Sequence, residues 1–201
     1  MKLYYSPGAC SLAVHILLAE LGKKYEVEKV DLASKKTASG ADFLMINPKG
    51  YVPALDIGRG QMLTEVQVIL QYLADKAKAT TLLPKAGTLA RYHAMETLNF
   101  VSTELHKGFG PLFNRAMPED GKAAVKERLA QRLGHLDSML AKSTYVNGKS
   151  FTVADAYAYT VLRWAPYTGF DMNRWPHIQS YMARMGARPA VQKVLAEEGL
   201  K

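Results

Sequence analysis

The residue of this sequence best suited to chemistry is its single cysteine, Cys10. It follows the turn signal Pro7-Gly8 and stands at the entrance to a helical pattern that begins at Ser11. Unpaired N–H groups and the helix dipole favour a thiolate at such a position, so we expect a reactive thiol. An inert buried cysteine is the alternative. With no second cysteine, a mixed disulfide at Cys10 would need an external thiol for its release.

Two further positions could act beside this thiol. Tyr5 and Ser11 flank the junction, and either hydroxyl could donate to a thiolate, although Tyr also suits a strand and Ser a helix start.

A further candidate for ligand binding is the Val52–Pro53 segment. If the Val52–Pro53 bond is cis, the backbone of Val52 turns outward, where it could pair with an extended peptide-like ligand. A trans proline heading a strand is the commoner arrangement.

A second strand-to-helix junction lies at Thr64-Glu65-Val66. The amide of Val66, at the positive end of the helix, could bind a carboxylate, and Glu65 could bind an ammonium group. An α-amino acid carries both charges on one carbon, so the junction suits a γ-glutamyl or amino-acid group. A simple capped helix is the alternative, with Thr64 as N-cap and Gln67 completing a capping box.

A polar set lies on the long helix predicted over residues 91–112. Asn99, Thr103 and His106 are spaced i, i+4, i+7, which predicts that they share one helix face. These short polar residues are less typical of a solvated face than Lys and Glu would be. The pattern leaves a functional groove and a solvent-facing stripe both open.

The elements that would position these residues alternate in the first third of the chain and are helical afterwards. Order and spacing predict β-α-β-α-β-β-α, with the first two strands parallel because a helix connects them. The fold class is therefore α/β followed by all-α. The expected strands span 2–5, 25–32, 52–57 and 61–64, and the expected helices span 11–21, 34–43 (weakly), 64 onward, 91–112, 123–140, 152–163 and 175–195, the last divided at Pro189.

The segment from Phe151 to Asp155 predicts a helix start. Thr152 can cap the helix, and Asp155 can reach back to the backbone N–H of Thr152. We interpret this segment as a folding determinant and not as a catalytic motif. Replacing Asp155 by alanine is expected to cost about 1 kcal/mol or somewhat more.

Composition limits the remaining function classes. The apolar runs are too short to cross a membrane, and Pro7 and Gly8 interrupt the N-terminal run, so we expect a cytoplasmic protein with no membrane partner. One Cys and five His residues argue against a metal site. The net charge of +8 suits a small anion. Without a basic run or an aromatic-basic motif, nucleic-acid binding is not expected.

Taken together, these features resemble the bacterial beta class of the glutathione transferases. The resemblance covers essentially the whole chain and rests on five motifs in order: MKLYYSPGACSL at 1–12, NPKGYVPAL at 47–55, Thr64-Glu65 before an apolar helix, NFVSTELHKGF at 99–109, and FTVAD at 151–155. One difference is Val66, since this family often has a small residue after the glutamate. Its backbone amide is retained, so binding at this position is still expected.

The resemblance implies a thioredoxin-like N-terminal domain (1–80) that binds glutathione, a linker (81–86) and an all-helical domain (87–201) with a pocket for the acceptor substrate. It implies a homodimer that uses glutathione as co-substrate and no metal. The glutathione thiolate would attack hydrophobic electrophiles, and Cys10 would support thiol–disulfide exchange. The alternatives are a glutathione-dependent reductase, peroxidase or dehalogenase on the same scaffold, or a non-catalytic binding protein.

The family's functional residues transfer to matching positions of this chain. The implied catalytic residues are Cys10, His106, Tyr5 and Ser11. The implied glutathione-binding residues are Cys10, Lys35, Val52, Pro53, Glu65, Val66, Asn99, Thr103, Glu104 and His106, with Lys35 at the glycyl carboxylate and Glu104 able to reach the partner subunit's ligand. The implied acceptor pocket is lined by Phe109, Phe113, Tyr157 and Trp164.

Overall fold

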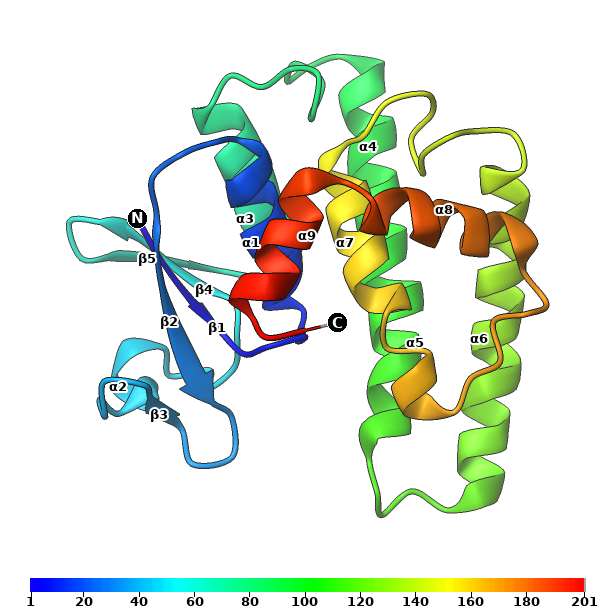
Figure 1. The fold of residues 1–201 in the computed structure, drawn as a ribbon, viewed down its shortest axis with the longest axis horizontal. Helices are drawn as coiled ribbons and strands as arrows, with labels where there is room; N and C mark the ends of the chain where they lie inside the picture. The colour runs from blue at the N-terminus through cyan, green and yellow to red at the C-terminus, as the bar shows by residue number, and fades with distance from the viewer. Residues whose placement is uncertain (201) are drawn as a thin grey trace. The chain divides into compact units, whose positions relative to one another are not determined.

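The computed structural model describes residues 1–200, which form two compact units (Figure 1). The first unit combines Met1–Lys78 with the segment from Arg188 onward, and the second is Ala79–Ala187. The helical domain expected from the sequence, 87–201, included that last segment. The structure packs it with the first unit instead, because the buried side chains of its helix lie against the first helix of the chain.

The first unit is built on a five-stranded sheet in the order β3-β2-β1-β4-β5. β1 and β2 are parallel, as predicted, and every other neighbouring pair is antiparallel. This is the thioredoxin-like arrangement that the sequence indicated. The strands are β1 (Lys2–Tyr5), β2 (Glu26–Asp31), β3 (Lys36–Thr37), β4 (Ala54–Gly58) and β5 (Gln61–Thr64).

Helices cover both faces of this sheet. α1 (Ser11–Glu20) packs against both α3 (Val66–Lys76) and α9 (Pro189–Glu197), and its residues from Ser11 to Leu18 are all buried. The short α2 (Phe43–Ile46) lies on the other face, where the rings of Phe43 and Tyr4 are 5.8 Å apart. Because successive strand residues point to opposite faces, Leu3 and Tyr5 face away from Tyr4.

The weak helix expected over residues 34–43 is wrong. Lys36 and Thr37 pair with β2 as a short strand, and the helix begins only at Phe43. Asp31 holds the intervening turn by accepting from the backbone N–H groups of Ala33 and Ser34, and this local bonding competes with helix formation.

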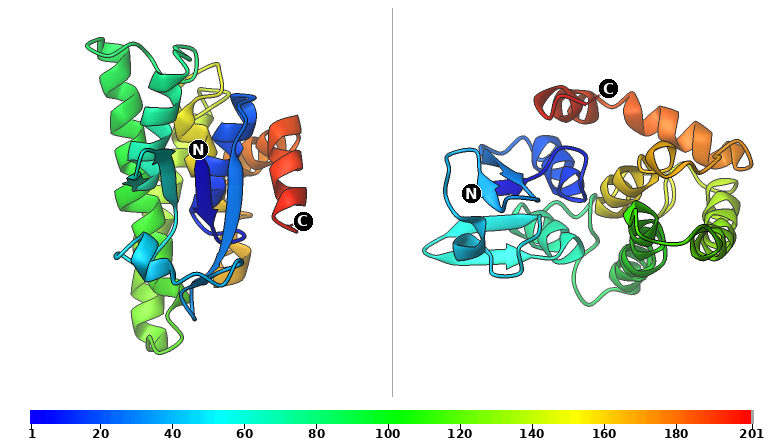
Figure 2. Two further views of the ribbon diagram at one scale, coloured as in Figure 1. Left: turned by 90° about the vertical axis from the view of Figure 1, so that its left-hand side faces the viewer. Right: turned by 90° about the horizontal axis from the view of Figure 1, so that it is seen from below.

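The second unit is all helical among its described elements (Figure 2). The predicted helix over residues 91–112 starts as an α-helix, becomes a π-helix and ends in a 3₁₀ turn, and α6 packs along its later part. The elements are α4 (Leu89–Phe100), the π-helix η1 (Val101–His106), α5 (Lys107–Phe109), η2 (Gly110–Phe113), α6 (Glu119–Leu140), α7 (Val153–Leu162), η3 (Pro166–Thr168) and α8 (Pro176–Gly186).

The predicted capping box at the start of α7 is confirmed. The Asp155 carboxylate accepts from the backbone N–H and hydroxyl of Thr152, both at 2.8 Å, and from the backbone N–H of Val146 at 2.9 Å. Asp155 is fully buried. Asp155 therefore joins the start of α7 to the preceding loop inside the core. A surface N-cap, by contrast, bonds only to the first turn of its own helix.

We expect Asp155→Ala to lower the unfolding free energy by about 3 kcal/mol at neutral pH, because several buried donors lose their acceptor. Burial raises the pKa of Asp155 from 3.8 to about 6, against the opposing hydrogen bonds from Val146 and Thr152. The folded protein thus holds this proton more tightly than the unfolded chain does. The contribution of the carboxyl group to stability is full below about pH 4 and falls as pH rises through about 6.

Urea unfolding of the wild type and of Asp155→Ala at pH 4 and pH 7 measures this. The difference between the two proteins should be larger at pH 4, by up to about 3 kcal/mol. Asp42→Ala, which removes the exposed N-cap of α2, is the matched control and should cost less at both pH values. A cost that grows with pH would contradict the expectation.

Candidate active site

The register of the sheet brings three functional segments to one edge of the first unit. Tyr4 lies opposite Ala54 on the neighbouring strand, and Ala54 lies opposite Thr64 on the next. The chain after Tyr5, the chain before Ala54 and the chain after Thr64 therefore leave the sheet at the same edge. These three segments carry Cys10, Val52–Pro53 and Glu65.

Cys10 and Val52 are in direct contact at this edge. Cys10 is the residue before α1, is half-buried, and its Sγ donates to the carbonyl oxygen of Val52 at 3.2 Å. The Val52–Pro53 peptide bond is cis. The structure thus joins two of the positions that the sequence indicated separately, the reactive thiol and the backbone of Val52.

The other two residues predicted beside the thiol have distinct surroundings. The buried Ser11 hydroxyl accepts from the backbone N–H of Ser6 at 3.2 Å and donates to its carbonyl at 3.3 Å, so it closes the turn before the helix. Burial first, and then Glu198 and Glu197, raise the pKa of Tyr5 above its usual value. The Tyr5 hydroxyl therefore keeps its proton over a wider pH range than an exposed phenol.

A buried pair that the sequence analysis missed supports the same turn. Glu198 accepts from the backbone N–H of Gly8 at 2.9 Å, and its other oxygen lies 2.9 Å from Nδ1 of His15. The two side chains have no exposed surface. His15 is fully buried on α1. A histidine there needs a polar partner, and that need was the available signal.

The Glu65 junction differs from its prediction in one respect. The expectation that Thr64 caps the helix, with Gln67 completing a capping box, is wrong: Thr64 ends β5, and Glu65 is the N-cap of α3, with φ of 70°. The Thr64 hydroxyl instead accepts from Nζ of Lys49 at 2.9 Å. Val66 is the first helical residue, where backbone N–H groups have no partner within the helix.

The Glu65 carboxylate already holds two donors, neither of which the sequence analysis named. Lys49 Nζ lies 3.1 Å from Glu65 Oε1, and the Tyr51 hydroxyl donates to the same oxygen at 3.0 Å. This hydrogen bond to Glu65 is the main reason that the pKa of Lys49 is raised. The Glu65 side chain is about half exposed, at 51%. The Glu65 carboxylate thus already forms an ion pair with one ammonium group, that of Lys49.

The loop before Val52 is fixed by its own hydrogen bonds. Asn47, which is buried, donates from its side chain to the carbonyl of Tyr51 at 2.8 Å. Lys35 donates from Nζ to the carbonyl of Gly50 at 2.7 Å. Gly50 has φ of 69°, which favours glycine. Lys35, predicted to meet a carboxylate, therefore stands beside this loop in the same unit as Cys10 and Glu65.

In the second unit, the polar set predicted on one face is divided by the π-helix. The i→i+5 bonding of a π-helix places more residues in each turn than an α-helix does, so the spacing i, i+4, i+7 no longer keeps all three residues aligned. Asn99 and Thr103 are exposed, and the Thr103 hydroxyl donates to the Asn99 carbonyl. His106 turns towards α7, with Nδ1 2.6 Å from the Tyr157 hydroxyl.

The four residues predicted to line an acceptor pocket form one aromatic cluster, in which Phe109 and Phe113 contact Trp164, and Trp164 and Tyr157 contact His106. The ring of Trp164 lies 4.9 Å from His106, 5.7 Å from Phe113 and 6.5 Å from Phe109. Phe109 and Tyr157 are buried, whereas Phe113 is 49% exposed. Of this cluster, Phe113 thus offers the most apolar surface to a ligand.

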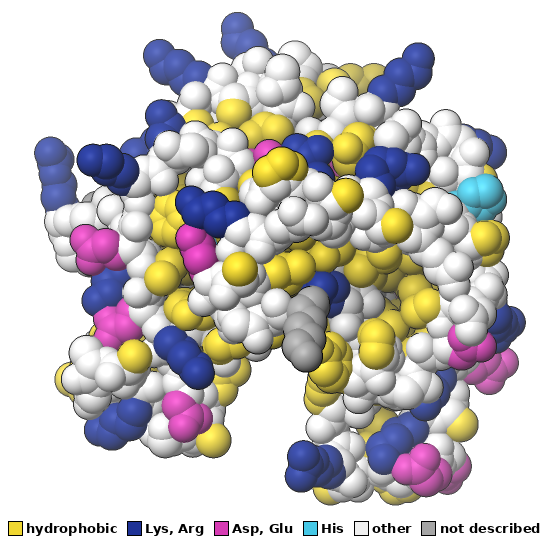
Figure 3. Space-filling model, viewed as in Figure 1, with side chains coloured by type: hydrophobic (Ala, Val, Ile, Leu, Met, Phe, Trp, Pro, Cys, Tyr) yellow, Lys and Arg dark blue, Asp and Glu magenta, His cyan; other side chains and the backbone are white. Residues whose placement is uncertain are grey.

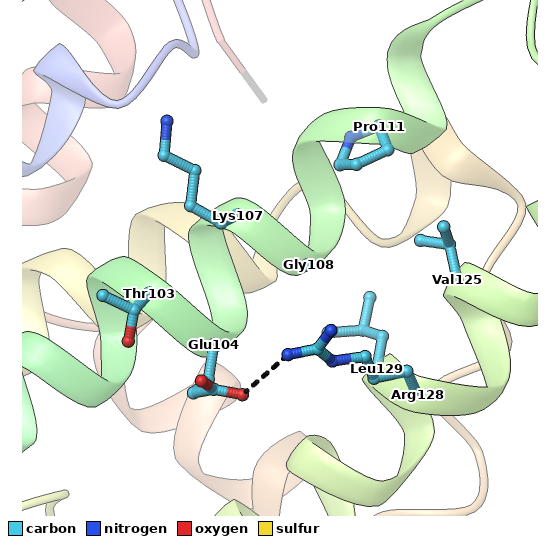
Figure 4. A pocket seen from close by; sticks show the side chains of 8 residues that line it. All are labelled: Thr103, Glu104, Lys107, Gly108, Pro111, Val125, Arg128 and Leu129. Carbon is cyan, nitrogen blue, oxygen red and sulfur yellow. Dashed lines mark ion pairs between the residues drawn. The ribbon is translucent and has the colours of Figure 1, made fainter.

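Glu104 faces α6 across a small cavity of about 180 Å³ (Figure 4). Its carboxylate lies 2.6 Å from Nε of Arg132 and 3.9 Å from Arg128. At Gly108, a Cβ atom would lie only 2.9 Å from a methyl group of Leu129, so the two helices approach closely there. Within this chain, Glu104 neutralises arginines of α6.

Three properties of the described residues bear on this site: surface charge, helix hydropathy and the placement of metal-binding side chains. On the face drawn in Figure 3, Lys and Arg side chains are spread out and do not form one patch. Among residues 1–200, no helix is long and apolar enough to cross a membrane. Within the same residues, His, Cys, Asp and Glu side chains form no group of three that could hold a metal ion.

Comparison with known proteins identifies the family. Residues 1–75 match the model of the glutathione S-transferase N-terminal domain, and residues 100–189 match that of the C-terminal domain. Glutathione S-transferase GstA of Escherichia coli O157:H7 is 46% identical over the full length of both chains. The chain belongs to the glutathione S-transferase family.

Solved structures similar to this chain indicate the class of glutathione S-transferase to which it is related. A bacterial beta-class glutathione S-transferase of Sphingomonas chungbukensis is 43% identical with a TM-score of 0.95, and both chains are covered completely. A sphingomonad glutathione S-transferase complexed with glutathione is 46% identical, again with a TM-score of 0.95 and complete coverage. The resemblance to the bacterial beta class that the sequence motifs indicated is confirmed.

Proposed function

We propose that this protein transfers the thiolate of glutathione to hydrophobic electrophiles and also exchanges thiols with disulfides through Cys10. The observation that carries the proposal is the contact of Cys10 with Val52, at the sheet edge that also carries Glu65. A thiol, a peptide-pairing backbone and a carboxylate at one edge suit a tripeptide with a thiol and an amino-acid end. The glutathione complex of the sphingomonad relative supports the same ligand.

The proposed binding mode assigns one task to each group of the first unit. The backbone of Val52, before cis-Pro53, pairs with the glutathione backbone, and the sulfur lies by Cys10. Glu65 binds the ammonium and the N–H of Val66 the carboxylate of the γ-glutamyl group. Lys35 meets the glycyl carboxylate.

The second unit has its own proposed tasks. Phe113 and Trp164 bind the electrophile, because Phe113 exposes apolar surface against Trp164. Roles for Asn99, Thr103 and His106 towards glutathione stay predictions of the sequence. We also propose that the protein is cytoplasmic and forms a homodimer. Light scattering, which gives the molar mass in solution, measures the oligomeric state directly.

Intact-protein mass spectrometry after incubation with oxidised glutathione tests the proposal. The Cys10 thiolate attacks one sulfur of the disulfide, a new S–S bond forms, and one glutathione leaves as its thiolate. We expect one glutathionyl adduct, located at Cys10 by peptide mapping and removed by excess reduced glutathione. A folded protein that forms no adduct and does not bind glutathione would contradict the proposed function.

Cys10→Ala separates the two activities. The adduct should be abolished, while part of the conjugating activity remains, because the glutathione thiolate and not Cys10 is the nucleophile in conjugation. Rates of conjugation with an activated aryl chloride measure this, and binding of glutathione by calorimetry serves as the control. Complete loss of conjugation in a Cys10→Ala protein that still folds and binds glutathione would contradict it.

A further inference from the structure

His106 is held by aromatic groups at a defined place in the second unit. It is the last residue of the π-helix η1, and its Nδ1 lies 2.6 Å from the Tyr157 hydroxyl. Its ring meets the ring of Tyr157 edge-on at 5.8 Å and that of Trp164 at 4.9 Å. One nitrogen of the imidazole is therefore committed to a hydrogen bond in the interior.

Tyr157 is a fixed partner for this nitrogen. Its side chain is 2% exposed, and it lies on α7, which packs against η1. Asp155, two residues earlier, ties the first turn of α7 to the core, and Tyr181 donates to the backbone carbonyl of Asp155 at 3.0 Å. A phenol held in this way cannot move into solvent without disturbing the helix.

The direction of this hydrogen bond sets which nitrogen of a neutral imidazole carries the proton, since a phenol can donate to a ring nitrogen or accept from a ring N–H. A phenol keeps its proton at neutral pH and can donate it, and a neutral imidazole has one acceptor nitrogen and one N–H group. We propose that Tyr157 is a positioning residue whose hydroxyl donates to Nδ1 of His106 and so holds the proton of the neutral ring on Nε2. Nε2 then presents a donor, which stabilises an anion such as a thiolate and does not abstract a proton. This last role rests on the proposed function, whereas the proton position does not.

The proton position is measured directly in the wild-type protein. Long-range ¹H–¹⁵N correlation spectra of uniformly ¹⁵N-labelled protein report the protonation of each histidine nitrogen, and His106→Gln assigns the His106 signals. We expect neutral His106 to carry its proton on Nε2. A proton on Nδ1, or an even mixture of the two forms, would overturn the proposal whether or not any variant folds.

Tyr157→Phe tests the cause, with Tyr159→Phe as the matched control. Tyr159 lies on the same helix, is equally buried, and its hydroxyl accepts from Arg163 instead of contacting His106. Tyr157→Phe should shift the tautomer ratio and the titration midpoint of His106, and Tyr159→Phe should leave both unchanged. Unchanged His106 spectra in a folded Tyr157→Phe protein would refute positioning by Tyr157.

Steady-state conjugation kinetics then test the role of the donor. Tyr157→Phe should lower kcat several-fold with little change in KM for glutathione, whereas Tyr159→Phe should change neither. A shifted tautomer without any change in kcat would overturn the anion-stabilising role of His106 but would leave its positioning by Tyr157 in place. Loss of glutathione binding in the wild type would refute the proposed function and not the tautomer assignment.

Discussion

Replacing Glu198 by alanine is expected to lower the unfolding free energy by about 3–5 kcal/mol, because it leaves buried polar partners without their acceptor. The carboxylate is wholly buried, accepts from the backbone N–H of Gly8 and lies 2.9 Å from Nδ1 of His15. Neither partner can recover water without opening α1 or α9. Urea or thermal unfolding of the two proteins measures the difference.

The neighbouring Glu197 provides the control for this experiment. Its carboxylate lies 3.1 Å from Nε2 of His15, but the side chain is 40% exposed. Water can therefore replace the hydrogen bond that this carboxylate offers to His15. Glu197→Ala should therefore cost clearly less than Glu198→Ala. Equal costs would show that burial of the carboxylate is not what makes Glu198 important.

Glu198→Ala should also slow the chemistry of the thiol two residues after Gly8. The turn that leads to Cys10 loses one of its anchors, while the Ser6–Ser11 hydrogen bonds remain. We expect slower formation of the glutathionyl adduct at a temperature where the variant is still folded. An unchanged adduct rate would mean that the Ser11 bonds alone fix this turn.

Glu65→Gln is expected to raise KM for glutathione by roughly 10- to 100-fold, the loss typical of one charge-assisted hydrogen bond. Glutamine keeps the size of the side chain, so the backbone at φ of 70° meets no new steric demand. What disappears is the negative charge that attracts Lys49 in the structure and, in the proposed mode, the ligand's ammonium group. Initial rates over a range of glutathione concentrations measure KM.

Tyr51→Phe is the matched control for the Glu65 variant. It removes the hydroxyl that donates to Glu65 Oε1 but keeps the carboxylate charge, so the rise in KM should be only a few-fold. If Tyr51→Phe weakened binding as much as Glu65→Gln, the hydroxyl and not the charge would be the important group. An unchanged KM in Glu65→Gln would remove Glu65 from the proposed binding site.

The elements that could be predicted are those whose signals are local in the sequence. The parallel pair β1 and β2 follows from a helix between two strands, and the start of α7 follows from Thr152 and Asp155 three residues apart. The failure over residues 34–43 has a local cause too, since the Asp31 carboxylate accepts hydrogen bonds from the backbone N–H groups of Ala33 and Ser34 and so favours a turn. The polar composition of residues 34–43 did not distinguish a helix from a turn followed by a short strand.

The missed parts of the site depend on contacts between residues far apart in the sequence. Glu198 reaches Gly8 only because α9 packs on α1, and Lys49 reaches Glu65 only because the loop before β4 lies beside the end of β5. The π-helix at Val101–His106 was missed for another reason: an apolar spacing of three or four residues does not reveal a change from i→i+4 to i→i+5 bonding.

The place of α9 has a consequence for biosynthesis. The unit that carries Cys10 is interrupted by the whole of Ala79–Ala187 and is completed only by the segment from Arg188 onward. A growing chain therefore leaves the α1 surface uncovered, with His15 and the Gly8 amide still lacking Glu198, until the segment from Arg188 onward has been synthesised and has packed on α1. Removing the segment from Arg188 onward would therefore destabilise the unit that carries Cys10, although these residues are remote from Cys10 in the sequence.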